Sequence, residues 1–143
     1  MEYVAMRWDH RMHAELVQWV VIECSAVEVQ KNGALQALPP RKDVAYFVDP
    51  ETAEELSKLF ADLKNGRLAA PSTAASDDPF KAYPWDHKAG NGLINWAVLR
   101  WDENHPLGRR DIAYFLWPET AEADATSFQS LVNLTPAAHA QAG

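Results

Sequence analysis

The chain repeats a stretch of its own sequence. RKDVAYFVDPETAE at residues 41–54 returns as RRDIAYFLWPETAE at residues 109–122, and ten of the fourteen aligned positions are identical. Three of the other four are conservative, so Asp49 against Trp117 is the one change of chemical character. A small chain that carries the same pattern twice is constrained to build the same structural unit twice and to bury both units together.

Each copy predicts a strand followed directly by a helix. Residues 44–48 and 112–116 carry apolar or aromatic side chains in both alternating series, which is typical of a strand covered on both faces. Pro50 and Pro118 then suit the first position of a helix, where a missing N–H costs nothing. Apolar residues at three- and four-residue steps continue each helix with one buried stripe.

A second similarity lies upstream, where VAMRWD at residues 4–9 resembles AVLRWD at residues 97–102. In the second copy only ENHPLG separates this motif from the repeat. In the first copy the connection is longer and contains a Val- and Ile-rich segment, 16–30, and then the hairpin signal Lys31-Asn32-Gly33. We therefore predict an α+β fold of internally duplicated ββα units. They form one mainly antiparallel sheet with two helices on one face, and an extra hairpin is inserted in the first copy.

These patterns predict a single duplicated domain over residues 1–134. Copy one spans 4–65 and copy two spans 94–132. The connection at 67–92 is rich in Ala, Ser, Pro, Asp and Gly and has little periodicity, so it is expected to be a functional or disordered linker. The small, polar tail at 135–143 is expected to fray.

Charge limits the classes of partner. Thirteen Lys and Arg against twenty Asp and Glu give a net charge of −7, which disfavours attraction to nucleic-acid phosphates or anionic lipid and suits a protein partner with a basic surface. No apolar run approaches the ~20 residues of a membrane span. The lone Cys24 and an N-terminus without the order of a secretory signal are expected for a cytoplasmic protein.

Trp117 is the first candidate for partner contact. The side chain of its counterpart Asp49 can cap a helix, and the second copy gives up that contribution of roughly 1 kcal/mol. A residue that is unfavourable for the local structure is expected at a functional site, and Trp is enriched among binding hot spots. The alternative is that Trp117 packs against the first turn of its own helix or into the core.

The linker supplies the second candidate. Its aromatic and acidic residues either dock on their own domain or contact a partner. These residues are Asp77, Asp78, Phe80, Tyr83 and Trp85.

Basic pairs begin both copies of the repeat. Arg41-Lys42 and Arg109-Arg110 form a weak candidate anion site, because paired cations bind carboxylates and phosphates. The alternative is that they are solvated charges that keep the strand starts soluble, or that they pair with the acidic residues following them.

Candidates for catalysis are sparse. Asp9, His10 and His13, with Asp102 and His105, offer carboxylates beside imidazoles, which serve as general bases or metal ligands. The spacing lacks the Glu of a metalloprotease helix, and the chain has no Gly-rich phosphate loop or G-x-S-x-G elbow. We therefore predict no catalytic residue, no metal site and no cofactor.

The sequence favours a small acidic protein-interaction module, of the inhibitor or immunity type, such as a phage anti-defence protein that blocks a partner's surface. One alternative is a metal-dependent hydrolase that uses the Asp and His pairs. Another is a small-ligand binder with pockets lined by Trp8 and Arg7 and by Trp101 and Arg100. A homo-oligomer is compatible with the pattern, and direct nucleic-acid binding is disfavoured.

Overall fold

The computed structural model describes residues 2–8, 16–68, 80–85, 94–101 and 108–133. Within these ranges the elements follow one another as three strands and a helix, twice. In order they are β1 (Glu2–Arg7), β2 (Trp19–Val29), β3 (Leu35–Phe47), α1 (Ala53–Lys64), β4 (Phe80–Pro84), β5 (Trp96–Trp101), β6 (Arg109–Phe115) and α2 (Ala121–Asn133).

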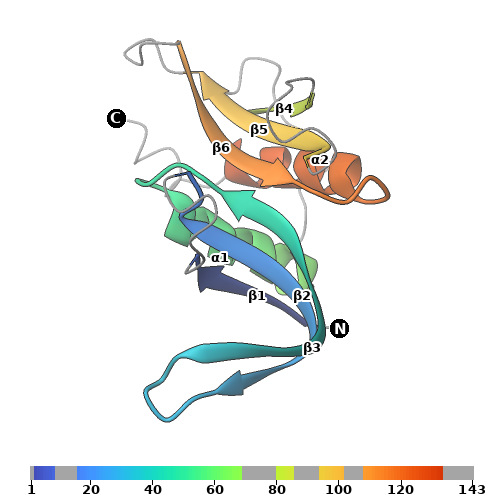
Figure 1. The fold of residues 1–143 in the computed structure, drawn as a ribbon. Coiled ribbons are helices and arrows are strands. Elements are labelled where there is room, and N and C mark those ends of the chain that lie inside the picture. The colour runs from blue at the N-terminus through green and yellow to red at the C-terminus, as the bar shows by residue number, and fades with distance from the viewer. Residues whose placement is uncertain (1, 9–15, 69–79, 86–93, 102–107, 134–143) are drawn as a thin grey trace.

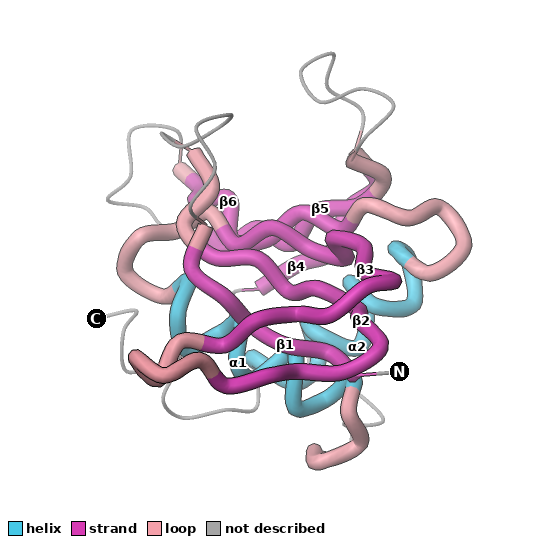
Figure 2. Tube along the Cα trace, turned by 60° about the horizontal axis from the view of Figure 1, so that its bottom comes forward, coloured by secondary structure: helices cyan, strands magenta, loops and turns pink. Residues whose placement is uncertain are grey.

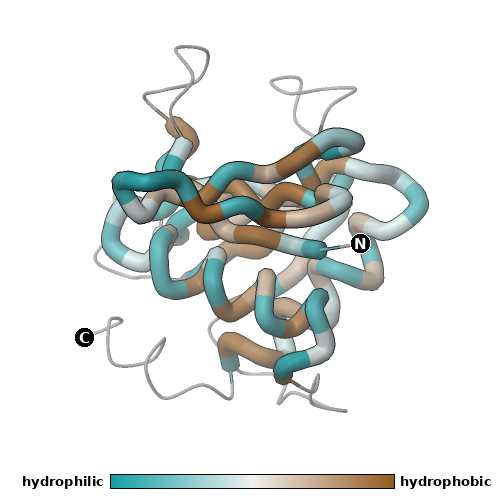
Figure 3. Tube along the Cα trace, turned by 90° about the horizontal axis from the view of Figure 1, so that it is seen from below, coloured by the Kyte–Doolittle hydropathy of each residue, from teal (hydrophilic) through white to brown (hydrophobic). Residues whose placement is uncertain are grey.

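The six strands form one sheet in the order β1-β2-β3-β6-β5-β4. Every neighbouring pair is antiparallel, and β3 and β6 meet at the centre. Both helices cover the same face of this sheet, which Figure 1 shows from one side and Figure 3 shows edge-on. The predicted α+β class, with an antiparallel sheet and two helices, is confirmed.

Three strands precede each helix. The sequence predicted an inserted hairpin in the first copy but only two strands in the second. β4 lies inside the segment 67–92, where we expected a linker. Its five residues follow Pro79 and end in Pro84, and they show too little alternation to predict a strand. The two similar upstream motifs also take different places. Residues 4–7 belong to the edge strand β1, whereas residues 97–101 belong to β5, which lies between β4 and β6.

The hairpin turn was predicted correctly. Residues Lys31–Gly33 join β2 to β3, and Gly33 has a φ of 85°, a left-handed conformation that favours glycine. The side chain of Asn32 accepts a hydrogen bond from the Ala34 N–H at 3.0 Å. The turn therefore depends on the asparagine for a side-chain hydrogen bond and on the glycine for the left-handed conformation, the two residue types that predicted it.

Four phenylalanines form the centre of the core between sheet and helices. Phe47 of β3 packs against Phe128 of α2 at 5.5 Å between ring centres, and Phe115 of β6 packs against Phe60 of α1 at 5.2 Å. Both contacts are edge-on, an arrangement that aromatic rings prefer. Each contact joins the first half of the chain to the second, so the halves share one core.

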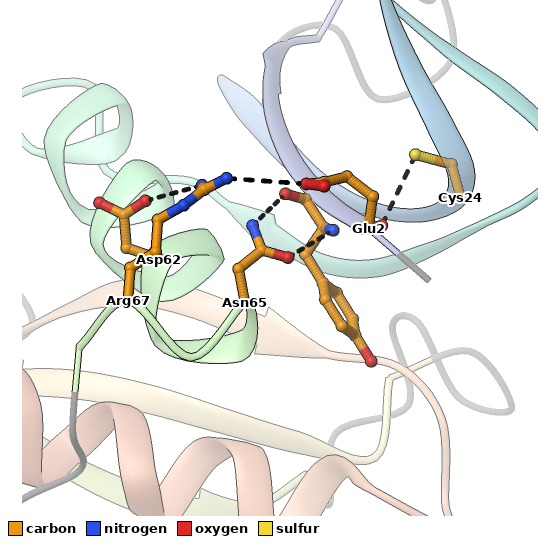
Figure 4. Close-up of polar contacts among 6 residues, drawn as sticks. Glu2, Cys24, Asp62, Asn65 and Arg67 are labelled. Carbon is orange, nitrogen blue, oxygen red and sulfur yellow. Dashed lines mark hydrogen bonds and ion pairs between the residues drawn. The ribbon is translucent and has the colours of Figure 1, made fainter.

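Two asparagines at the helix ends hold the edge strands. The Asn65 side chain accepts from the Tyr3 N–H at 2.9 Å and donates to the Tyr3 carbonyl at 2.7 Å, as Figure 4 shows. Asn133 makes the same two bonds to Phe80 of β4, both at 3.0 Å. One amide thus satisfies two backbone groups that an edge strand would otherwise present to water or to another chain.

Candidate functional site

The sheet face away from the helices carries a second apolar cluster. Tyr46 of β3 and Tyr114 of β6 are register partners there, while their strand neighbours Phe47 and Phe115 point into the helix-facing core. Figure 2 shows the strands in front of both helices. The buried members of this cluster are Val17, Val20, Tyr46, Val48, Ala97, Leu99, Tyr114 and Leu116.

A tryptophan packs on each central tyrosine. The ring centre of Trp8, just after β1, lies 5.0 Å from that of Tyr46, and the ring centre of Trp85, just after β4, lies 4.9 Å from that of Tyr114. The Tyr46 hydroxyl donates to the Asp43 carboxylate at 3.1 Å, and Tyr114 donates in the same way to Asp111. Burial raises the pKa of Tyr46, and the neighbouring Asp43 carboxylate raises it further, so this phenol stays neutral and donating at ordinary pH.

A groove of about 810 Å³ crosses this face between Trp8 and Trp117. We call it the Trp8–Trp117 groove. Its volume lies within the range of roughly 300–1,000 Å³ that is usual for ligand sites. Arg41, Lys42 and Asp43 of β3 also line it. Its apolar lining comes chiefly from Met6, Val20, Ile22, Tyr46 and Leu116.

Trp117 is held at one end of the groove by β3. The Lys42 ammonium lies 4.6 Å from the centre of the indole ring, and the indole N–H donates to the Asp43 carbonyl. The side chain remains 37% exposed. Trp117 therefore presents a fixed ring surface, and its only hydrogen-bond donor is already used.

The charges of the groove are mainly positive. Arg41 and Lys42 are exposed, and within the described residues no carboxylate lies at ion-pair distance from either. The Arg41 guanidinium makes a long hydrogen bond of 3.4 Å to the Ala37 carbonyl. Arg7 also lines the groove. Its charge makes the smallest contribution to the lowered pKa of Glu54 on α1, whose main cause is the hydrogen bond from Lys58.

The matching position in the other half of the repeat contains an ion pair instead. Arg110 aligns with Lys42 in sequence, and its guanidinium lies 2.8 Å from Glu51 and 3.7 Å from Asp49, the counterpart of Trp117. The Asp49 carboxylate is buried and also accepts from the Thr52 hydroxyl at 2.7 Å. A smaller hollow of about 300 Å³ lies here.

The structure thus combines two candidates that the sequence kept apart. Trp117, predicted as a partner contact, and Arg41 and Lys42, predicted as an anion site, line one groove. Arg110 is instead paired with the protein's own carboxylates. Arg109 lies in β6, and its side chain is outside the described residues.

The linker aromatics do not form one surface. Phe80 is 0% exposed and belongs to the core, so its side chain is not available to a partner here. Tyr83 is 38% exposed on the edge strand β4. Trp85 is half-buried against Tyr114. Asp77 and Asp78 lie outside the described residues.

The predicted catalytic alternative rests on residues that the structure does not describe. All five lie in the ranges 9–15 and 102–107. No group of three His, Cys, Asp or Glu that could hold a metal occurs among the described residues. Cys24 is buried, and burial raises the pKa of its thiol, as expected for a packed side chain and not for a nucleophile.

The residues beneath the groove were missed by the sequence analysis. Tyr46 and Ile22 lie in strands covered on both faces, so alternation alone did not show which face stays accessible. The available signal was the position of Tyr46 between Ala45 and Phe47, because a strand turns alternate side chains to opposite faces. Trp8 was considered for a pocket, and it does line one.

No protein-family model, curated protein or solved structure matches the chain. No helix in the described part of the chain is long and apolar enough to cross a membrane. The chemistry of the groove is therefore what bears on function.

Proposed function

We propose that this chain is a protein-binding module without catalytic activity, and that it acts by occupying a partner's surface in the manner of an inhibitor or immunity protein. The observation that carries the proposal is the Trp8–Trp117 groove. It combines apolar lining, two tryptophans and two exposed cations on a sheet face that neither helix covers. Aromatic residues and arginine dominate the energetics of protein interfaces.

Trp117 gives the strongest support within the groove. In the first half of the chain the Asp49 carboxylate at this position accepts from the Thr52 hydroxyl and lies 3.7 Å from Arg110, whereas Trp117 offers no carboxylate for such contacts. Its ring is partly exposed and is fixed by Lys42 and the Asp43 carbonyl. A rigid, partly exposed aromatic loses little conformational entropy when a partner covers it.

We further propose that the fold consists of two copies of a βββα unit. The backbone N–H of Trp8 donates to the Gln18 carbonyl, and the backbone N–H of Trp85 donates to the Asn95 carbonyl, both at 3.0 Å. The two asparagines at the helix ends hold the edge strands in the same paired way. Duplication would make positions 49 and 117 equivalent, and of these two only position 117 is a tryptophan.

A small-ligand binder is the second candidate function. It is favoured by the volume of the groove, which would suit a compact ligand, and by Trp8 and Arg7, which both line it. It differs from the first proposal in what would be bound when the protein is isolated under native conditions.

Photo-cross-linking in a lysate of the organism that produces the protein tests the main proposal. A photoreactive phenylalanine analogue at position 117 is expected to cross-link one protein at high yield, and the same analogue at the exposed Lys58 on α1 is not. Ile22→Glu in the groove should abolish the cross-link while the protein stays folded. Equal cross-linking from both positions would contradict the proposal. A small molecule retained in native mass spectrometry, without a protein, would favour the second candidate.

A further inference from the structure

We propose that the Trp8–Trp117 groove recognises an acidic segment of its partner, with carboxylates bound by Arg41 and Lys42 and a neighbouring apolar or aromatic side chain bound against Trp117 and Ile22. This inference rests on the proposed function and specifies the chemistry of the partner.

The charge distribution is the first argument. The chain carries a net charge of −7, yet the groove presents adjacent cations. Four other cations, Lys58, Lys64, Arg67 and Arg110, have a carboxylate within 4 Å. Among the described residues Arg41 and Lys42 have none. Arg7 and Lys31 have none among these residues either, but Lys31 lies at the hairpin turn, whereas Arg7 lines the same groove as Arg41 and Lys42. Three unneutralised cations in one groove give it a positive potential, and such a potential selects a negative partner.

The hydrogen bonding of the groove is the second argument. The Tyr46 hydroxyl donates to Asp43, and the Trp117 N–H donates to the Asp43 carbonyl. These two donors are used within the protein. Lys42 keeps its ammonium group at one end, beside a flat ring. Carboxylates of a ligand would therefore be bound by the Lys42 ammonium. An apolar side chain would lie on the exposed part of the Trp117 ring and on Ile22, whose register partner is Asp43.

The other half of the molecule contains an internal version of the proposed contact. Arg110, at the position equivalent to Lys42, lies 2.8 Å from Glu51 and 3.7 Å from Asp49. At the groove, Trp117 stands where Asp49 supplies one of those carboxylates. Trp117 leaves Lys42 without the counterpart of Asp49, and Glu119, the counterpart of Glu51, does not lie within 4 Å of Lys42. An external carboxylate can take their place.

Phosphate is the other anion that two cations attract. Nucleic-acid binders neutralise many phosphates along an extended basic surface, whereas this groove has one basic pair and an acidic surrounding protein. An acidic protein segment is therefore the occupant that these charges favour, and a nucleic acid becomes an outcome of the test.

The test is selection of a phage-displayed library of random peptides on the immobilised protein, followed by anisotropy titrations of the enriched peptides. We expect Asp- or Glu-rich peptides with a Phe, Leu or Trp. Lys42→Glu should weaken their binding about tenfold or more. Lys31→Glu, the same charge change at the exposed hairpin turn outside the groove, should leave binding unchanged.

Three results would overturn the inference. Basic or neutral peptides that lose binding on Ile22→Glu but not on Lys42→Glu would overturn the charge assignment and leave the proposed function standing. Peptides that bind all variants equally, or no enrichment at all, would overturn both. A single-stranded oligonucleotide that binds the wild-type protein more tightly than the enriched peptides would replace the acidic segment by a nucleic acid.

Discussion

The Lys42 ammonium lies 4.6 Å from the centre of the Trp117 ring, at the position where the other half of the repeat places Arg110 beside Asp49. Both arrangements satisfy a cation, one with an aromatic face and one with a carboxylate. They differ in what they leave accessible. The carboxylate neutralises its arginine, whereas the aromatic face leaves the charge of Lys42 available to a ligand.

Restoring the carboxylate at position 117 tests this difference. Trp117→Asp should keep the free energy of unfolding within about 1 kcal/mol of the wild-type value. The new carboxylate can accept from the Thr120 hydroxyl, as Asp49 accepts from Thr52, and this contact offsets the lost ring contacts. The new carboxylate should also pair with Lys42 and weaken binding of acidic peptides about tenfold. Chemical denaturation and peptide titration give the two readouts. A Trp117→Ala variant, which gains no carboxylate, is the comparison, and a greater loss of stability in Trp117→Asp than in Trp117→Ala would refute the equivalence of positions 49 and 117.

The two asparagine bridges should differ in their contribution to stability. Asn65→Ala leaves the N–H and C=O of Tyr3 without their side-chain partner at a partly exposed edge, and we expect a loss of about 1 kcal/mol. Asn133→Ala does the same to Phe80 at a buried position, and we expect about 2–3 kcal/mol. Urea denaturation measures both. Asn32→Ala at the exposed hairpin turn is the control, and equal losses at positions 65 and 133 would show that burial does not set the cost.

The sequence predicted the class of fold because local signals agreed with the final contacts. The turn at Asn32-Gly33 depends on neighbouring residues and is present. A helix also follows each repeated strand, but the helices begin at Ala53 and Ala121, three residues after the prolines that were expected to open them. β4 was missed because its pairing with β5 is what defines it, and nothing within Phe80–Pro84 announces that pairing. The similarity of residues 4–9 to 97–102 led us to treat the two segments as equivalent strands of the repeated unit. In the structure the first lies in the edge strand β1 and the second in the inner strand β5.

The candidate site was predictable only in part. Trp117 broke a local rule for helix starts, and such a conflict can be read from one sequence. The proximity of Trp117 to Arg41 and Lys42 depends on β6 pairing with β3, a contact between residues far apart in the chain. The burial of Phe80 likewise follows from α2, whose Asn133 fixes its backbone.

Stability should fall at high pH through Tyr3. Burial raises the pKa of its phenol from 10.0 to about 12, and the hydrogen bond to Glu23 adds to this effect. The unfolded chain therefore loses this proton first, so the contribution is complete below pH 10 and is lost as pH rises toward 12.

Denaturation of the wild type and of Tyr3→Phe across this range should show a shallower fall in the variant. Tyr83→Phe, at an exposed position of β4, serves as the control. Identical slopes in the wild type and Tyr3→Phe would contradict the assignment.

Phe60 and Phe128 should contribute equally to the core if the two helices are equivalent. Both side chains are fully buried, and their ring centres lie 5.8 Å apart. Phe60→Ala and Phe128→Ala should each lower the free energy of unfolding by about 3–5 kcal/mol, because each leaves a cavity among rings from both halves. Leucine at either position keeps most of the volume and should cost less, which keeps the comparison measurable if the alanine variants do not fold.

Because the two rings touch, a double-mutant cycle should give a coupling of about 0.5–1.5 kcal/mol. Additive losses would mean that the halves pack independently, and that result would contradict a single shared core.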